Sequence, residues 1–219
     1  MTNPLICISR TTGAGGEDVG RIVSDRLGFI YLDEEIVVRA AEKEGVDPEE
    51  IADVERRKSL ARRIVDEVKK SVSWDAYAAL GGVATPPPTD WSKRYRELIR
   101  EVIVETAEEG NAVIVAHAAA LVLGGRDQVL RVLVTASEDT RARRLAEANR
   151  VDADPAGEQV KADDVDRADY VKRFYGVERE LPTHYDMVLN TDHFTFEQAA
   201  GLVLDGARDL AGSARAAAR

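Results

Sequence analysis

The chain has 219 residues, about one and a half times the length of a typical domain, and 44% of them are hydrophobic. Charged residues make up 32%, so the composition suits a closed apolar core and not intrinsic disorder. The 30 Lys and Arg against 40 Asp and Glu give a net charge of −10. This charge disfavours a general binder of nucleic-acid backbones, so any anionic ligand must be held locally. The absence of sequence repeats excludes a solenoid.

The N-terminus lacks the basic start, apolar run and cleavage site of a secretory signal, and no apolar run reaches the roughly 20 residues that span a bilayer. We therefore expect a cytoplasmic protein. Cys7 is the only cysteine, and its apolar neighbours place it in a buried strand, so no disulfide is expected. His117, His184 and His193 are too scattered to suggest a metal site, and we predict no structural metal.

Short apolar runs separated by helical patterns follow one another along the chain. The expected strands are residues 5–9, 29–32, 112–116, 129–134 and 186–189. Helices are expected at residues 17–27, from 33 onward, at 92–109, from 137 or 138 to 149, and at 196–210. This alternation predicts an α/β fold, with a five-stranded parallel sheet, helices on both faces and ligands at the carboxyl ends of the strands.

Three further segments differ in composition from this alternating pattern. Charged helical patterns and a stiff proline-rich run predict a helical insertion over residues 45–91. The polar stretch at 150–175 suits a mobile lid, and residues 212–219 suit a disordered tail. We expect residues 1–211 to form a single domain that includes the insertion and the lid.

A glycine-rich loop lies between the first expected strand and the first helix. Bare backbone N–H groups in such a loop can close around phosphate oxygens at a helix N-terminus. The dinucleotide pattern G-x-G-x-x-G matches at Gly13 and Gly15 but requires glycine at Asp18. The mononucleotide pattern G-x-x-x-x-G-K-[ST], anchored on Gly15, puts Gly16 at the lysine and Glu17 at the hydroxyl. A tight strand-to-helix turn without a ligand is the third interpretation.

Motifs elsewhere in the chain favour a nucleotide site. A strand ends in Leu-Asp at Asp33, with Arg39 six residues on, and the segment Thr-Ala-Ser at 135–137 leads into an arginine-rich helix. A late strand ends in Asn-Thr at 190–191, and the glycine loop reads Ile-Ser-Arg-x-x-Gly-x-Gly-Gly over residues 8–16. Together these motifs resemble the cytidylate kinase group of nucleoside monophosphate kinases, most closely its cytidylate kinase-like branch, which also lacks the loop lysine. The resemblance extends over residues 5–45 and 95–205.

This resemblance implies a P-loop NTPase-like three-layer fold and an ATP- and Mg²⁺-dependent kinase for a nucleoside monophosphate such as CMP. The phosphate- and ATP-binding residues would be Arg10, Gly13, Ala14, Gly15, Gly16 and Thr191. The acceptor would be bound by Asp33, Arg39 and His117. Arg167 on the lid and Arg144 on the arginine-rich helix would be catalytic, stabilising the charge of the transferred group while the closed lid excludes water.

Each of these residues also has a structural interpretation. Asp33 suits a helix N-cap, Arg39 a solvated helix face, and His117 a polar residue that closes a strand. Arg144 and Arg167 suit a solvated charged surface. The structural and binding roles of Asp33 are compatible.

Two departures from the branch remove positive charge near the expected phosphates. His117 stands in or next to the place where the branch usually has arginine, and Glu17 stands where it often has arginine. Histidine is only partly charged at neutral pH. The alternative to an active kinase is therefore a nucleotide-binding regulatory protein that has lost turnover. In both cases we expect small nucleotides as ligands, no nucleic acid and no membrane, and a homodimer stays open.

Overall fold

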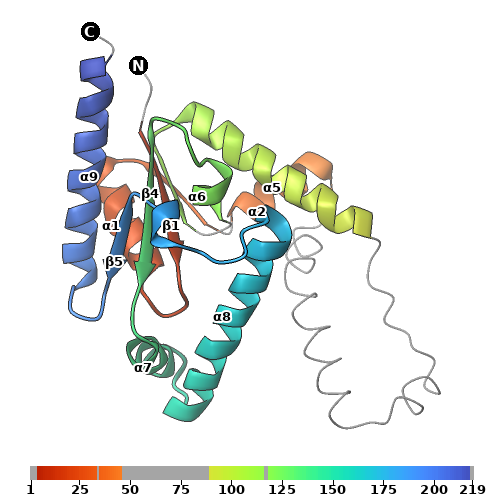
Figure 1. The fold of residues 1–219 in the computed structure, drawn as a ribbon, viewed down its shortest axis with the longest axis vertical. Helices are drawn as coiled ribbons and strands as arrows, with labels where there is room; N and C mark the ends of the chain where they lie inside the picture. The colour runs from red at the N-terminus through yellow and green to blue at the C-terminus, as the bar shows by residue number, and fades with distance from the viewer. Residues whose placement is uncertain (1–3, 34, 46–88, 116–117, 218–219) are drawn as a thin grey trace. The chain divides into compact units, whose positions relative to one another are not determined.

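The computed structural model describes residues 4–33, 35–45, 89–115 and 118–217. The chain divides into two compact units, one formed by Met1–Asp33 with Ile103–Arg219 and the other by Glu34–Val102. The first unit holds the sheet and its helices (Figure 1). Most of the expected insertion at 45–91 lies outside the described residues.

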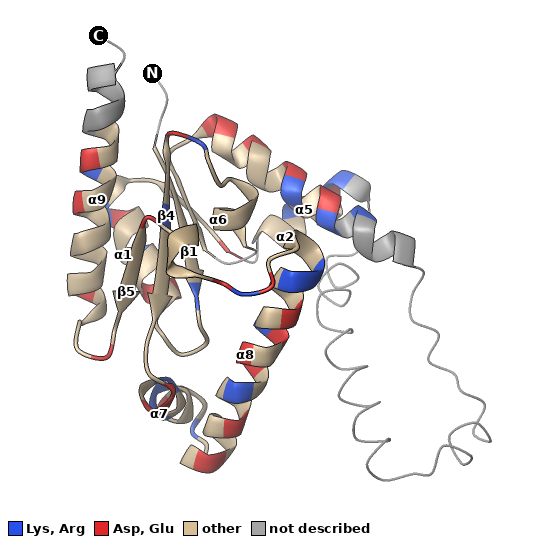
Figure 2. Cartoon of the chain, in the orientation of Figure 1, with Lys and Arg blue, Asp and Glu red and all other residues tan. Residues whose placement is uncertain are grey.

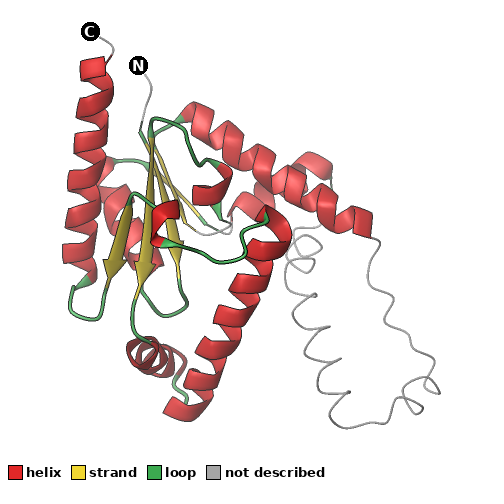
Figure 3. Cartoon of the chain, viewed as in Figure 1, coloured by secondary structure: helices red, strands yellow, loops and turns green. Residues whose placement is uncertain are grey.

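Within the described residues, five strands form one parallel sheet in the order β2-β3-β1-β4-β5 (Figure 3). The strands are β1 Leu5–Arg10, β2 Ile30–Leu32, β3 Ala112–Val115, β4 Val129–Thr135 and β5 Met187–Asn190. Ile8 lies opposite Val115 on one neighbour and Val132 on the other, so the carboxyl ends of the central strands meet at one edge. The sheet expected from the apolar runs is confirmed, with bounds that shift by one residue at some ends.

Helices α1 (Gly16–Leu27) and α9 (Phe196–Ala217) pack together against the sheet (Figure 1). Ile8 of β1, Val19 of α1 and Val203 of α9 belong to one buried apolar cluster. The side chains of β1 alternate between the two faces of the sheet, so Ile8 faces this cluster while its neighbour on the chain faces the opposite layer. Burial of this apolar surface is the main favourable contribution to the folding of the unit.

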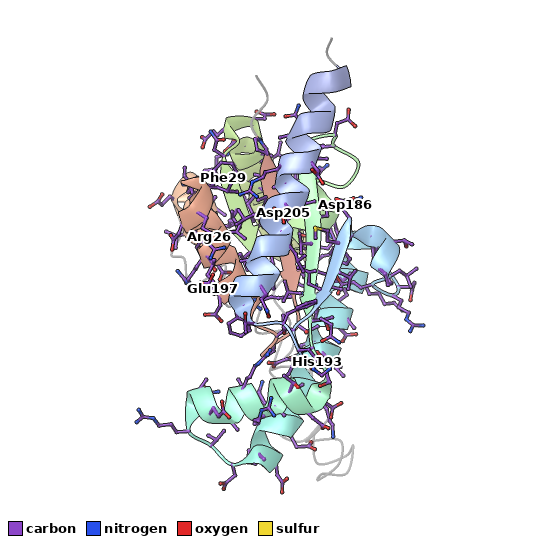
Figure 4. The ribbon with its side chains drawn as sticks, turned by 90° about the vertical axis from the view of Figure 1, so that its left-hand side faces the viewer. Arg26, Phe29, Asp186, His193, Glu197 and Asp205 are labelled. Atoms are coloured by element: carbon purple, nitrogen blue, oxygen red, sulfur yellow. The ribbon has the colours of Figure 1, made fainter. Side chains whose placement is uncertain are left out.

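An ion pair on the surface joins these two helices. Arg26 of α1 and Glu197 of α9 lie against each other (Figure 4). Both side chains are exposed, so the pair adds little stability. Helix α9 continues to Ala217, beyond residue 210 where the sequence pattern ends it and into the expected tail at 212–219. The alanine-rich end of the chain explains this extension, because alanine has the highest helix propensity.

The remaining helices near the sheet follow β3 and β4. The short α6 (Ala119–Val122) packs on β1 and β4. Helix α7 (Glu138–Asn149) begins at its N-cap Ser137, whose Oγ accepts a hydrogen bond from the backbone N–H of Thr140 at 3.4 Å. Helix α8 (Ala153–Tyr175) lies beside α7 (Figure 1).

Helix α8 spans most of residues 150–175, where the sequence predicts a lid; the lid stays a prediction. Charges of both signs alternate along it (Figure 2), while Ala156, Val160 and Val171 are buried. These few small apolar side chains give the otherwise polar helix a buried face. None of the helices in the described ranges is long and apolar enough to cross a membrane.

Two helices belong wholly or partly to the second unit. These are α2 (Glu35–Glu44) and α5 (Thr89–Glu109), which begins three residues before the expected start at 92. Lys43 Nζ of α2 lies 3.8 Å from Glu101 of α5.

Candidate functional site

The glycine loop joins the end of β1 to the start of α1 and leaves several amides without helix partners. The first helix-type bond runs from Val19 N–H to the Gly15 carbonyl at 3.0 Å. The amides of Gly16, Glu17 and Asp18 therefore precede the hydrogen-bonded part of α1, where the helix dipole favours an anion. This arrangement can bind phosphate oxygens.

Gly13 and Gly15 both have positive φ, 79° and 82°, which favours glycine. A Cβ on Gly15 would stand 2.2 Å from Cε1 of Phe196, and one on Gly13 would stand 2.7 Å from the carbonyl oxygen of Arg141. The space beside each glycine is thus filled by α9 or α7. Packing against the protein itself, together with the backbone angle, accounts for glycine at both positions.

Arg144 of α7 lies against the back of the glycine loop. Its Nη1 donates to Thr191 Oγ1 at 2.9 Å, and its Nη2 donates to the Thr191 carbonyl at 2.6 Å. Longer contacts of 3.4 and 3.5 Å reach the carbonyls of Gly13 and Ala14. The guanidinium also stacks 5.0 Å from the ring centre of Phe196. Arg144 therefore connects α7, the loop and the end of β5.

Thr191 is fully buried beside the loop. Its hydroxyl lies 2.8 Å from the Ala14 carbonyl, to which it donates, and its backbone N–H donates to Thr135 at 2.8 Å. The structure thus brings Thr191, Arg144 and the loop together, as expected for one site. These contacts hold the loop from behind.

Arg141 also contacts the loop, although the sequence analysis gave it no role. Its buried guanidinium donates to both carboxylate oxygens of Asp164, at 2.8 and 2.6 Å, and reaches the Thr12 carbonyl at 3.4 Å. One helix face carries Arg141 and Arg144, and a spacing of three residues is the only sequence signal for this arrangement. The ion pair of Arg141 with Asp164 connects α7 to α8, and the bond from Arg141 to Thr12 connects α7 to the loop.

Arg10 and Glu17 form an ion pair at the front of the loop, with 2.5 Å between Nε and Oε1. Glu17 therefore offsets the charge of Arg10, although the contact lacks the geometry of a hydrogen bond. Thr11 Oγ1 and Arg141 Nε are buried and have no hydrogen-bond partner within the described residues. Unsatisfied buried donors are costly, and their concentration around this loop fits an anion with several oxygens.

Arg167 of α8 is bound to a carboxylate. Its Nε and Nη2 donate to the two oxygens of Glu180 at 2.7 and 2.8 Å. Burial opposes the charge of Arg167, but its bonds to Glu180 outweigh this effect and hold its pKa above the ordinary value. Arg167 is therefore a fixed cation in the structure.

The predicted acceptor residues lie in different parts of the chain. Asp33 follows β2 in the first unit, and its Oδ2 accepts a bond from the Tyr31 hydroxyl at 3.3 Å. Arg39 is half-buried on α2 in the second unit. His117 lies outside the described residues, and Ala118 after it has a positive φ of 51°. Joint binding of an acceptor by these three residues stays a prediction.

Two aspartates fasten the ends of β5. Asp186 accepts bonds from Arg131 Nε at 3.0 Å and Nη2 at 2.6 Å, and Arg131 lowers the pKa of this carboxyl. Asp192 Oδ1 accepts bonds from the backbone N–H of Ser137 at 2.9 Å and its hydroxyl at 2.8 Å, which hold the pKa of Asp192 well below its usual value. Asp192 thus joins the end of β5 to the start of α7.

The described residues contain no group of three or more His, Cys, Asp or Glu side chains arranged to hold a metal ion. In kinase sites Mg²⁺ is usually bound by one or two carboxylates together with substrate phosphates and water.

Comparisons with known proteins agree with this geometry. A family model described as the cytidylate kinase-like family matches residues 5–193. The chain is similar to the solved structure of an uncharacterized protein from Eubacterium ventriosum, with 17% identity, a TM-score of 0.65 and coverage of 94% of this chain and 99% of that chain. It is also similar to a gluconokinase from Sinorhizobium meliloti, with 12% identity, a TM-score of 0.51 and coverage of 100% and 99%. No curated protein matches the chain.

At these identities the solved structures bear on the fold alone. Together with the sheet order they confirm the α/β three-layer fold of P-loop kinases. The family model covers most of the chain, from the first strand to the turn after β5. The chain therefore belongs to the cytidylate kinase-like family.

Proposed function

We propose that this protein transfers a phosphoryl group from ATP to a nucleoside monophosphate such as CMP. One observation carries the proposal: Thr11 Oγ1 and Arg141 Nε, two buried donors without a hydrogen-bond partner within the described residues, lie with the Arg10 cation around a glycine loop at the N-terminus of α1. Cationic and hydroxyl donors in this arrangement suit the oxygens of a polyphosphate. Family membership supports the same class of chemistry.

The residues around the loop suit the phosphates of ATP even without a loop lysine. ATP would supply the activated phosphoryl group, with Mg²⁺ offsetting part of its charge. The amides of Gly15 and Gly16 and the side chain of Arg10 would hold phosphate oxygens, while Arg144 and Thr191 support the loop from behind. Arg167 would stabilise the charge of the transferred group, because phosphoryl transfer depends mainly on positioning and electrostatic stabilisation.

Asp33 and Arg39 are proposed to bind the acceptor, Asp33 through its hydrogen-bonding carboxylate and Arg39 through a charge-assisted bond to phosphate. His117 would add a weaker and pH-dependent contact. No nucleic acid or membrane is part of the proposal. The proposed location of this kinase is the cytoplasm.

The pair formed by Arg10 and Glu17 favours a second candidate, a nucleotide-binding regulatory protein without turnover. Glu17 offsets the one cation that belongs to the loop itself. If the pair persists with nucleotide bound, the loop holds less positive charge for the transition state than a loop with a lysine does.

A coupled assay of ADP release over a panel of nucleoside monophosphates, with ATP-binding calorimetry on the same protein, tests the proposal. Turnover of one or more monophosphates is the expected result. ATP binding without turnover of any acceptor would favour the regulatory protein, and no ATP binding would contradict both candidates.

A further inference from the structure

Glu180 connects Arg167 to the central strand of the sheet through two further side chains. The hydroxyl of Tyr185 donates to Glu180 Oε1, and the hydroxyl of Ser9 donates to that of Tyr185. Ser9 directly precedes Arg10 at the end of β1. A continuous series of hydrogen bonds therefore runs from the residue before the glycine loop to the guanidinium of Arg167 on α8.

All four side chains are buried or partly buried, and hydrogen bonds are stronger where water is excluded. Tyr185 is 6% exposed and Ser9 2%, and the side chains of Arg167 and Glu180 are 23% and 19% exposed. Burial and the bond to Glu180 raise the pKa of Tyr185 to about 12, so its hydroxyl stays protonated and continues to donate at neutral pH. Removing one member of a buried charged pair leaves the other charge uncompensated.

The bonds to Glu180 use only one edge of the Arg167 guanidinium. Nε and Nη2 face the carboxylate, so Nη1 takes no part in these two bonds. A guanidinium has five N–H donors in a planar fork, so it can hold a carboxylate on one edge and an anion on another. The contact with Glu180 is thus compatible with phosphate binding by Arg167.

We propose that Glu180 is a positioning residue, held by Tyr185 and Ser9, that fixes the guanidinium of Arg167 relative to the glycine loop and leaves its Nη1 side for the transferred phosphoryl group. This inference rests on the proposed phosphotransferase function. Without Glu180 the arginine would lose both of its bonds to a carboxylate, and its long side chain would be held less firmly. Ser9 directly precedes Arg10 at the end of β1. The hydrogen bonds from Ser9 through Tyr185 and Glu180 would therefore hold Arg167 at a fixed position relative to the loop.

Glu180→Gln tests this role, because glutamine keeps the size of the side chain and removes its charge. We expect kcat to fall roughly 10- to 100-fold with little change in the KM for ATP, since a small misplacement of a catalytic group costs on that order. Tyr185→Phe should lower kcat by a smaller factor, because Glu180 keeps its bonds to Arg167 but loses its link to Ser9.

Glu178→Gln is the matched control. Glu178 lies two residues away on the same segment and also pairs with α8, at 2.6 Å from Lys172 Nζ. Both of these side chains are exposed, and neither has a place in the proposed site. This variant should keep the wild-type kcat. An equal loss of kcat in Glu178→Gln would contradict the proposal, because it would mean that the effect arises from loosening the segment.

Arginine side-chain NMR adds a readout that does not depend on turnover. The Nε–H resonance of Arg167, assigned by its loss in Arg167→Lys, should exchange slowly with water in the wild type. It should exchange faster in Glu180→Gln and be unchanged in Glu178→Gln. A double variant, Arg167→Ala with Glu180→Gln, should have the kcat of Arg167→Ala alone, because Glu180 acts through the arginine.

The outcomes separate this inference from the proposed function. Wild-type protein that turns over no monophosphate overturns both. Active wild type, with Glu180→Gln unchanged in kcat or with losses that add to those of Arg167→Ala, overturns the positioning role alone. A rise in kcat for Glu180→Gln would also overturn it, because Glu180 would then be withholding Arg167 from the substrate.

Discussion

Arg144 and Thr191 are joined by two hydrogen bonds, from Nη1 to the threonine hydroxyl at 2.9 Å and from Nη2 to its carbonyl at 2.6 Å. The pair closes the contact between α7 and the end of β5 directly behind the glycine loop. It fixes two backbone segments that the sequence separates widely. The loop is consequently held by side chains on its far side as well as by its own turn.

Replacing Arg144 should therefore weaken nucleotide binding. Arg144→Ala is expected to reduce ATP affinity about 10-fold or more, because hydrogen bonds to charged groups contribute about 1.5–3 kcal/mol and 1.4 kcal/mol corresponds to a factor of ten. Calorimetry measures the change. Arg143→Ala, at the exposed neighbouring position of α7, is the control and should bind ATP like the wild type. Equal affinities in the two variants would exclude a supporting role for Arg144.

Gly15→Ala should destabilise the fold as well as the site. The positive φ costs about 1–2 kcal/mol for a residue with a Cβ, and the added carbon would collide with the ring of Phe196. The substitution should cost less in a Phe196→Ala background, where the ring is gone but the backbone angle remains. Urea denaturation of the four proteins in this cycle measures the difference. The same cost in both backgrounds would show that the ring is no obstacle.

Arg39 and Arg167 should affect different kinetic constants. Arg39→Ala should mainly raise the acceptor KM, because it removes binding that is equal in the ground and transition states. Arg167→Ala should lower kcat, by about 10³-fold or more, as when a transition-state arginine is removed. Steady-state kinetics with each substrate varied distinguishes these effects, and Arg179→Ala, an exposed arginine after α8, serves as a control. Wild-type kinetics in both variants would remove these two residues from the site.

The bond between Asp186 and Arg131 should make stability depend on pH in the acid range. The pKa of Asp186 is lower in the folded protein than in the unfolded chain, where it is about 3.9. Its contribution is thus complete above the unfolded pKa and is lost as pH falls through the lower folded value. Asp186→Asn should cost about 1 kcal/mol at neutral pH, after allowance for solvent screening. Denaturation series at neutral and acid pH should show this difference disappear in acid.

ATP affinity should decrease with salt. The cations near the loop are arginines partly open to solvent, such as Arg10, and no lysine is fixed in the loop. Ions screen such exposed charges, with a Debye length of about 10 Å at 0.1 M. Calorimetric titrations over a range of ionic strengths measure the slope. Affinity that ignores ionic strength would mean that backbone amides alone hold the phosphates.

The elements built on strong periodicity could be predicted from the sequence, and the contacts between them could not. The run at β1 and the glycines after it already indicate a strand, a loop and a helix. Helix α8 has few apolar positions, so the sequence pattern gives little indication of its packing beside α7. The bond between Arg141 and Asp164 exists only because these two helices lie side by side.

The candidate site, like the fold, could be predicted only where a sequence motif indicates it. The glycines, Arg144 and Thr191 belong to recognisable motifs that come at strand ends. Glu180 lies in a charged segment, and no spacing rule relates it to Arg167. Its partner Tyr185 comes directly before Asp186, and nothing in the sequence indicates a role for the tyrosine hydroxyl. Only the crossing of this segment over β1 brings the hydroxyl to Ser9.

Strand β5, at the edge of the sheet, is fastened by Arg131 near its start and by Arg144 at Thr191 just after its end. Local opening of this edge therefore removes a support of the glycine loop at the same time. A ligand that binds only the intact loop lowers, by mass action, the population in which the β5 edge is open. Amide hydrogens of β5 should consequently exchange more slowly when ATP is bound, even though the strand itself makes no contact with the nucleotide.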